Sequence, residues 1–302
     1  MVHVGDRQHV RLFRGPDATI SRRRVSTAAQ LILALSVMAT ALAVCPEEAG
    51  DDFKSVRAHA LHLQQQGMGA EAIECFEVAG RLDTARPEPW LSIGEIFRGA
   101  GQFPQAISAL RKCCAIANSD GRPGWALAHF NLANALKDAG EPEEAVLHFE
   151  TSLALDPPFK PAIFNNMALA LGALNRNDEV LQSYKRALDL NPAFPETHNN
   201  IASHYQALGR LSEAVTHYKQ AVELRPDRGF MVNLAYVLGA KGDTAASIET
   251  YMSAIQVHPD YALAYYNLGT TLMGEERYSE SEFCYRWAVQ LDGTFLDPFF
   301  FQ

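Results

Sequence analysis

Cysteine is scarce in this sequence, and its few copies are scattered. The 302 residues include five cysteines, an odd number that matches no zinc-binding spacing. This excludes a disulfide framework and a structural zinc site. Four of the cysteines fall within helical patterns and are predicted to pack as small apolar side chains, the usual role of a buried free cysteine: Cys75, Cys113, Cys114 and Cys284.

Basic residues are also fewer than acidic residues. The chain has 26 Lys and Arg against 35 Asp and Glu, which gives a formal net charge of −9. This balance argues against a general nucleic-acid binder and against a polybasic protein of the membrane surface. Because 48% of the residues are hydrophobic and 20% are charged, the chain can still bury a substantial core.

Motifs that carry catalysis are missing as well. The sequence has no nucleophile elbow, no phosphate-binding glycine loop and no dinucleotide fingerprint. His59 and His62 stand three residues apart, as two metal ligands on a helix can, but no third ligand accompanies them at helical spacing. We therefore predict a protein that is not an enzyme and that holds no metal or cofactor.

Long apolar runs are absent except for one, AAQLILALSVMATALAV, over residues 28–44. Six arginines and two acidic residues precede it, so the first 44 residues carry +4 and the remainder carries −13. A basic segment, an apolar segment and then small residues is the order of a targeting signal. As a helix the run would be about 25 Å long, slightly short of a hydrocarbon core of about 30 Å.

Residues 1–50 are therefore predicted to be a targeting or anchor segment. Cleavage of this segment, or its retention in a membrane through Ala28 to Val44, would place the protein in a secretory or organellar compartment. The alternative is an apolar helix that caps the following domain, in a cytoplasmic protein.

From residue 53 onward the sequence repeats itself. A column of small residues recurs at spacings of 34, 39, 35, 34, 33 and 34 residues. A bulky column lies four residues after it, and a second small column lies seven residues after it. The first column is Ala72, Ala106, Ala145, Val180, Ala214, Ser247 and Ser281; the bulky column is Phe76, Leu110, Phe149, Tyr184, Tyr218, Tyr251 and Tyr285; the second small column is Ala79, Cys113, Ser152, Ala187, Ala221, Ala254 and Ala288. Small residues around a bulky one allow helices to pack closely.

Each repeat has a second apolar series upstream, with the spacing of one helix face. Turn residues separate the helices. Glycines that tolerate positive φ stand between the two helices of a repeat at 67, 101, 140, 209 and 242, and prolines follow the second helix at 157, 192, 226 and 259. Residues 53–294 are therefore predicted to form seven two-helix repeats in one all-α domain.

Two segments, HFNLANALKDAGEPEEAVLHFETSLALDPP and THNNIASHYQALGRLSEAVTHYKQAVELRP, closely resemble tetratricopeptide repeats (TPRs). The resemblance covers all seven repeats. It implies helix pairs stacked into a right-handed α-solenoid, with the first helix of each pair lining a concave groove. The longest spacing, between the second and third repeats, predicts a kink there.

An asparagine column stands one residue before the large apolar residue of each first helix in the last five repeats: Asn131, Asn166, Asn200, Asn233 and Asn267. On the TPR model this column faces the groove. A carboxamide carries both a donor and an acceptor, so it can pair with the backbone of an extended peptide. The column resembles the asparagine ladder of O-GlcNAc transferase repeats. In many TPR proteins, however, asparagine at this position ties neighbouring helices together, and the two roles are compatible.

Other groove candidates are mostly uncharged: Phe130, Asn134, Asn165, Asn199, Ser203, Gln206, Tyr236, Tyr266 and Thr270. Three hypotheses for function follow. The first is a non-catalytic scaffold that binds a peptide or protein partner. The second is the substrate-recognition region of an O-GlcNAc-transferase-like glycosyltransferase, or a truncated relative of one. The third is a membrane-tethered assembly factor.

The chain ends in the aromatic tail FLDPFFFQ, residues 295–302. A solenoid usually finishes with a polar capping helix. We therefore predict that the tail packs on the last repeat, mediates self-association, or marks an incomplete chain.

N-terminal sequencing of the protein from its native cells tests the predicted leader. Because small residues that fit a cleavage site lie near residues 39–43, a cleaved signal predicts a mature protein that starts near Glu47, whereas an anchor predicts that Ala28 to Val44 are retained. That start would rule out a retained anchor, whereas an intact N-terminus would contradict cleavage.

Overall fold

The structure is a computed structural model that describes residues 52–118 and 125–295. Within these ranges the chain forms fourteen α-helices and no β-strand, which confirms the predicted all-α class. The helices follow one another as seven pairs: α2 (Phe53–Gln65) and α3 (Gly69–Leu82), α4 (Glu88–Gly99) and α5 (Phe103–Asn118), α6 (Ala126–Asp138) and α7 (Pro142–Ala154), α8 (Lys160–Ala173) and α9 (Asn177–Leu190), α10 (Pro195–Ala207) and α11 (Leu211–Leu224), α12 (Arg228–Lys241) and α13 (Thr244–Val257), α14 (Ala262–Gly274) and α15 (Tyr278–Leu291). A short 3-10 helix, η2 (Gly293–Phe295), follows.

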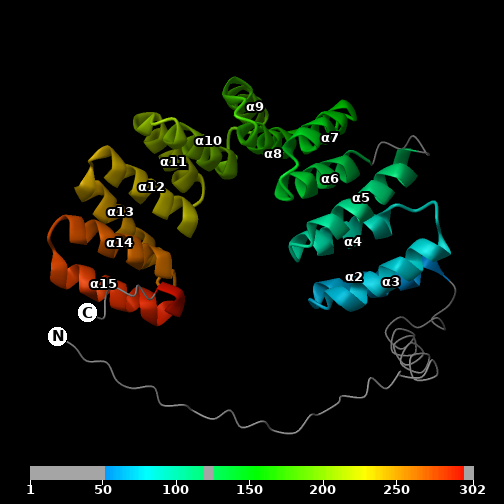
Figure 1. Ribbon diagram of the computed structural model, residues 1–302, viewed down its shortest axis with the longest axis horizontal. Helices are drawn as coiled ribbons and strands as arrows, with labels where there is room; N and C mark the ends of the chain where they lie inside the picture. Colours follow the sequence, from blue (N-terminus) through cyan, green and yellow to red (C-terminus); the bar gives the residue numbers. More distant parts are fainter. Residues whose placement is uncertain (1–51, 119–124, 296–302) are drawn as a thin grey trace, which may run out of the picture.

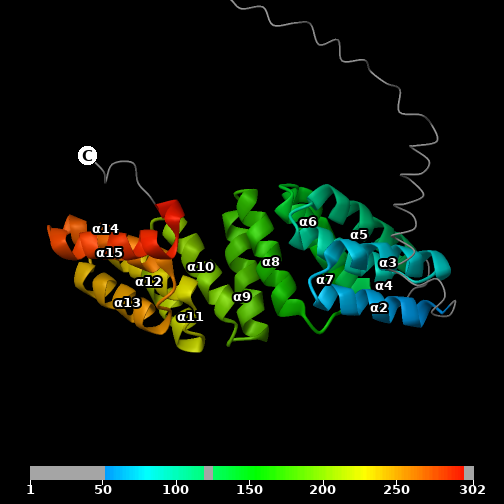
Figure 2. The same cartoon turned by 90° about the horizontal axis from the view of Figure 1, so that it is seen from below.

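The pairs stack into an open arch, an α-solenoid (Figure 1). Each helix packs against the next one along the chain, both within a pair and between pairs. At α4, α6, α8 and α12 the first helix of the pair lies on the inner side of the arch, and the second helix lies on the outer side. Figure 2 shows the same pairs from below, side by side from one end of the arch to the other.

The predicted columns form the contacts between helices. Ala72, Ala106 and Ala145 are fully buried, as are the bulky Phe76 and Phe149. Close approach has left little room between the two helices of the second repeat. A Cβ atom added at Gly94 would lie 2.4 Å from the Leu110 side chain. The small residues are therefore required by the separation of the helices.

The hydrophobic core crosses every repeat boundary. One cluster runs without interruption from Ala106 in α5 to Ile201 in α10, and three smaller clusters connect the remaining repeats. A single helix pair thus buries its apolar face only against its neighbours, as expected for a solenoid. Residues 119–124, at the longest spacing between repeats, lie outside the described residues, so the kink expected there stays a prediction.

A residue with positive φ ends the first helix of every repeat. The five predicted glycines have φ between 71° and 95°. In repeats four and seven the same place is held by Asn175 (φ 58°) and Glu276 (φ 60°). Asparagine tolerates this region better than most residues, whereas glutamate adopts it at a cost. The turn geometry is therefore kept even where the glycine is missing.

The cysteine prediction is confirmed for three residues and wrong for one. Cys113, Cys114 and Cys284 are buried and free. Cys75 is also fully buried, but it is disulfide-bonded. None of the helices in the described part of the chain is both long and apolar enough to cross a membrane. The apolar run at 28–44 and the tail after Phe295 lie outside the described residues.

Replacing Glu276 by Gly should stabilise the fold by about 1 kcal/mol, because glycine removes the cost of a left-handed backbone. Urea denaturation followed by circular dichroism measures the change. The converse variant, Gly140→Ala, should lose about 1 kcal/mol at the equivalent turn of repeat three. A destabilised Glu276→Gly protein would contradict the assigned backbone conformation.

Candidate functional site

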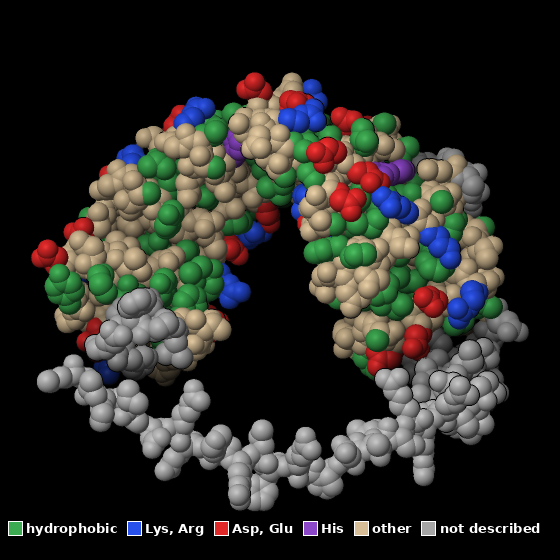
Figure 3. Space-filling model, in the orientation of Figure 1, with side chains coloured by type: hydrophobic (Ala, Val, Ile, Leu, Met, Phe, Trp, Pro, Cys, Tyr) green, Lys and Arg blue, Asp and Glu red, His purple; other side chains and the backbone are tan. Residues whose placement is uncertain are grey.

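The asparagine column lies on the first helices α6, α8, α10, α12 and α14, of which α6, α8 and α12 are seen on the inner side of the arch (Figure 1). Figure 3 shows the open hollow that the arch surrounds. The predicted column therefore occupies the same place on five successive first helices. Its members differ, however, in what they contact.

Three members of the column bridge neighbouring repeats. Asn166 Nδ2 donates to Asn134 Oδ1 at 2.8 Å. One repeat further, Asn200 Nδ2 donates to Asn165 Oδ1 at 3.1 Å. At the next boundary Asn233 Nδ2 donates to the Oδ1 of Asn199 at 3.0 Å. Each bond joins helices of successive repeats.

Two further bonds connect these bridges. Asn165 Nδ2 donates to Asn166 Oδ1 at 3.0 Å, and Asn199 Nδ2 donates to Asn200 Oδ1 at 3.4 Å. The three bridges donate toward the N-terminal end of the solenoid, and the two connecting bonds link them into one donor-to-acceptor chain from Asn233 to Asn134. Hydrogen bonds in such a chain polarise one another. We call this chain the asparagine relay; its members are Asn134, Asn165, Asn166, Asn199, Asn200 and Asn233.

Burial separates two kinds of relay residue. Asn134 and Asn165 are buried, each 5% exposed, and Asn165 Oδ1 also accepts from Thr197 Oγ1 at 3.1 Å. The other four are half-buried. A carboxamide has two N–H donors and two lone pairs, so each half-buried amide keeps unused bonding capacity beyond the relay. The half-buried members are the ones that can meet a ligand.

Asn131 stands apart from the relay. It is buried, and its Nδ2 donates to Glu95 Oε1 of the preceding repeat at 2.7 Å. Like Asn134, it connects repeats from within the stack. The sequence pattern alone did not distinguish these two residues from the half-buried members, and a role for either in ligand contact stays a prediction.

The last member, Asn267, lies in a pocket of ≈ 250 Å³ between repeats six and seven. Tyr236 and Thr270 also line this pocket, and the hydroxyl of Tyr251 is hydrogen-bonded to Asn267. The predicted Tyr236 is 56% exposed and so offers an open aromatic face. Tyr266 is half-buried. Its ring packs against Phe295 with centroids 5.2 Å apart, so the start of the C-terminal segment contacts the last repeat.

Charge is unevenly distributed along the inner helices. Three and six residues after the column, repeats four to seven carry only uncharged residues: Leu169, Gly172, Ser203, Gln206, Tyr236, Gly239, Thr270 and Met273. The equivalent places in repeats two and three include Glu95, Arg98 and Lys137. Arg98 Nη1 pairs with Asp138 at 3.0 Å across the repeat boundary. The inner face from repeat four onward therefore meets a ligand without charged groups at these places.

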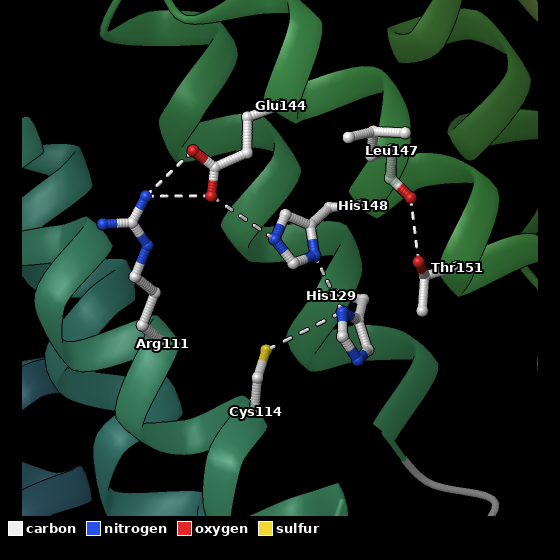
Figure 4. A network of polar contacts seen from close by, with 7 residues as sticks. All are labelled: Arg111, Cys114, His129, Glu144, Leu147, His148 and Thr151. Carbon is white, nitrogen blue, oxygen red and sulfur yellow. Dashed lines mark hydrogen bonds and ion pairs between the residues drawn. The ribbon is translucent and has the colours of Figure 1, made fainter.

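A second polar cluster, which the sequence patterns did not predict, connects the two helices of repeat three (Figure 4). The Nδ1 atoms of His129 and His148 lie 2.9 Å apart, and the rings are stacked. Glu144 lies 3.7 Å from His148 Nε2 and also accepts both bonds of Arg111. Cys114 Sγ lies 3.9 Å from His129 Nδ1. In repeat five, His198 and His217 form the same contact at 3.1 Å.

These histidine pairs favour the neutral state. An Nδ1 to Nδ1 contact requires one donor and one acceptor, so it is lost when both rings are protonated. Burial and the neighbouring His148 lower the pKa of His129. Burial likewise lowers the pKa of His148, although Glu144 acts in the opposite direction, and burial and His198 lower the pKa of His217. The histidine pairs also lack the geometry of a metal site: among the residues that the structure describes, no three His, Cys, Asp or Glu side chains are arranged to hold a metal ion.

Comparisons with known proteins find the repeat from the third helix pair onward. Models of the tetratricopeptide repeat match residues 126–159, 161–194, 195–228 and 262–295, and a further TPR model matches residues 235–274. Together they span more than half of the chain. Tetratricopeptide repeat protein 17 of Danio rerio is 33% identical over 107 residues. The match covers 34% of this chain but only 8% of that relative.

Solved structures share the fold at low sequence identity. The type IV pilus biogenesis factor PilW matches with a TM-score of 0.63 and 20% identity, over 73% of this chain and 98% of its own. The APC/C hetero-tetramer Cut9-Hcn1 matches with a TM-score of 0.60 and 13% identity, over 87% of this chain and 50% of its own. MamA from Desulfovibrio magneticus RS-1 matches with a TM-score of 0.51 and 19% identity, over 59% and 97%. These likenesses show the fold alone.

The histidine pairs predict that stability falls on acidification. Because the pKa values of His129, His148 and His217 are lower in the folded chain than the ordinary 6.5, the unfolded chain binds protons first as the pH drops. The contribution of these three histidines to the free energy of unfolding should thus decrease as the pH falls from 7.5 to 5.5. Urea denaturation at pH 7.5 and 5.5 measures this loss. Replacing His148 and His217 by Asn, which retains a hydrogen-bonding group, should reduce it; an equal loss in the variant would contradict the assignment.

Proposed function

Since residues 126–295 carry these repeats, the chain belongs to the tetratricopeptide repeat family, and we propose that it is a non-catalytic scaffold. In this proposal it holds an extended segment of a partner protein on the inner face of the arch. The observation that carries the proposal is the asparagine relay. It holds amide groups from four successive repeats in one orientation on that face.

The spacing of the repeats suits an extended backbone. Neighbouring helices stand about 8–10 Å apart and an extended chain advances about 3.3 Å per residue, so each repeat spans about three residues of peptide. The half-buried amides can donate to the carbonyls and accept from the N–H groups of the peptide. Because the relay already fixes their rotamers, little side-chain entropy is lost on binding. At about 0.5–1.5 kcal/mol per hydrogen bond, the affinity is modest and depends weakly on the peptide sequence.

The absence of charge at the positions flanking the column in repeats four to seven supports an uncharged partner segment. A charged side chain buried there would lose its hydration without gaining a partner. The open ring of Tyr236 and the pocket beside Asn267 would receive apolar or uncharged polar side chains.

A second candidate is that the same groove recognises protein substrates for an O-GlcNAc-transferase-like glycosyltransferase. The asparagine column favours it, because the column resembles the ladder of those enzymes. In that case a glycosyltransferase activity would copurify with the chain.

The hypothesis of a membrane-tethered assembly factor depends on residues 28–44 and is tested by the N-terminal sequencing described above.

We also propose a secretory or organellar location. The disulfide bond of the buried Cys75 supports it, since disulfides persist mainly in oxidising compartments. The basic and apolar order of residues 1–44 points to the same compartments.

Selection of peptides from a random 15-residue display library on the full chain tests the proposed groove. We expect selected peptides to be poor in charged residues and to lose about tenfold in affinity on Leu169→Glu, which places a charge beside the relay. The matched control is Leu147→Glu on the outer side of α7, where Leu147 is 62% exposed. Equal effects of the two variants, or none from Leu169→Glu, would contradict binding on the inner face.

Replacing Asn200 and Asn233 together by Ala tests the relay itself. These amides bridge repeats, so the variant should lose some stability but remain helical by circular dichroism. Its affinity for the same peptides should also fall about tenfold, the effect of losing roughly two hydrogen bonds. Unchanged affinity would mean that the relay only ties the repeats together.

A further inference from the structure

Repeats six and seven carry an apolar groove on the outer side of the arch. One wall is formed by Ile248, Met252 and Ile255 of α13, and the opposite wall by Phe283 of α15. Leu268 and Leu272 of α14 line it from below. The groove has a volume of ≈ 390 Å³, and the α14 residues that line it differ from those of α14 that line the pocket beside Asn267.

Large side chains at the edge of this groove are open to solvent. Met252 and Phe283 are each 59% exposed, and Trp287 is 37% exposed. Trp287 also stacks on Tyr265 and contacts the edge of Phe283, with ring centroids 6.2 Å apart in both pairs. A cluster of exposed aromatic and aliphatic groups on a soluble domain marks an interaction surface. We call Met252, Phe283 and Trp287, with the groove beside them, the outer apolar surface.

The fold does not require apolar residues at these places. Five residues after the first small column, where Met252 stands, every other repeat has a charged residue: Glu77, Arg111, Glu150, Lys185, Lys219 and Arg286. Two residues after it, where Phe283 stands, the others are Glu74, Ser108, Leu147, Gln182, Thr216 and Glu249. The outer apolar surface is therefore a local feature of the last two repeats.

The stacking of repeats leaves these places uncovered. Repeats four and five have neighbours on both sides, and yet Lys185, Lys219, Gln182 and Thr216 are all exposed. A helix pair packed after α15 would thus leave the outer apolar surface open. A partner that covers the outer apolar surface must therefore approach from the outer side of the arch.

The charged residues beside this surface would be complementary between two copies of the chain. Glu282 and Arg286 stand one turn apart on α15, next to Phe283 and Trp287, which are also one turn apart. Both charged side chains are well exposed, at 66% and 80%, and their mutual contact is 3.5 Å. When two α15 helices meet antiparallel, the glutamate of each copy lies opposite the arginine of the other. In the same arrangement Phe283 of one copy lies opposite Trp287 of the other.

We propose that two copies of the chain associate through the outer apolar surface, with their α15 helices antiparallel about a two-fold axis. The protruding Phe283 and Met252 of one copy would pack into the groove of the other. Because three large apolar side chains are exposed on this surface and its charged pairs are open to solvent, we expect a weak contact with a dissociation constant on the order of micromolar. Both inner faces stay open, and the dimer presents two grooves to a partner with repeated segments.

Sedimentation velocity of the full chain from about 1 to 100 µM tests this association. We expect a shift from monomer to dimer over this range. Met252→Lys and Phe283→Glu, introduced together, should weaken dimerisation at least tenfold. They should not disturb folding, because Lys219 and Glu249 hold the equivalent places in repeats five and six. The control Leu147→Glu, in the same column of repeat three, should leave the equilibrium unchanged.

Charge reversal separates a two-fold contact from other modes of association. Glu282→Arg or Arg286→Glu alone should weaken the dimer several-fold, and the two together should restore it. A wild-type chain that is monomeric at 100 µM would overturn the proposal, as would a dimer unaffected by the Met252 and Phe283 replacements. Loss of the dimer on deleting residues 296–302, with those replacements harmless, would place the contact in the tail and equally overturn it.

Discussion

The close approach of neighbouring helices is the constraint on which the rest of this structure depends. A two-helix unit cannot bury its own apolar face, and the hydrophobic clusters here all cross repeat boundaries. Close approach requires small residues, such as Ala106 and Gly94, beside bulky ones, such as Leu110. Since the same columns recur in every repeat, the separation of the helices recurs too. The regular inner face of the arch is a consequence of this packing.

The asparagine relay follows from that regularity. Side chains as short as asparagine bridge two helices only where the helices are held at one small separation. The relay achieves this at three successive boundaries. Its half-buried members bridge the repeats and also retain bonding capacity toward the hollow of the arch. A structural and a binding role are therefore compatible in the same amide, because a carboxamide has more donors and lone pairs than one bridge uses.

Much of the fold could be predicted from the sequence because packing columns leave a periodic trace. The seven helix pairs and their glycine turns were visible in this way. Asn175 and Glu276 escaped notice, since backbone conformation at those turns is imposed by the repeat and not by the residue. Two histidine pairs recur at the same separation of 19 residues: His129 with His148, and His198 with His217. This spacing is present in the sequence, but it indicates a contact only once the pairing of the helices is known. The disulfide of Cys75 and the outer apolar surface left no periodic signal, because each breaks the pattern of the repeats.

The central claim is that the inner face of repeats three to six binds its partner through amides held in place by the relay. The most direct test is a side-chain amide NMR spectrum of protein labelled with ¹⁵N only at asparagine, recorded with and without a bound partner segment. The account predicts that the resonances of Asn166, Asn199, Asn200 and Asn233 shift, while those of the exposed Asn118 and Asn177 do not. Shifts confined to asparagines outside the relay, with the relay resonances unchanged in the bound protein, would contradict it.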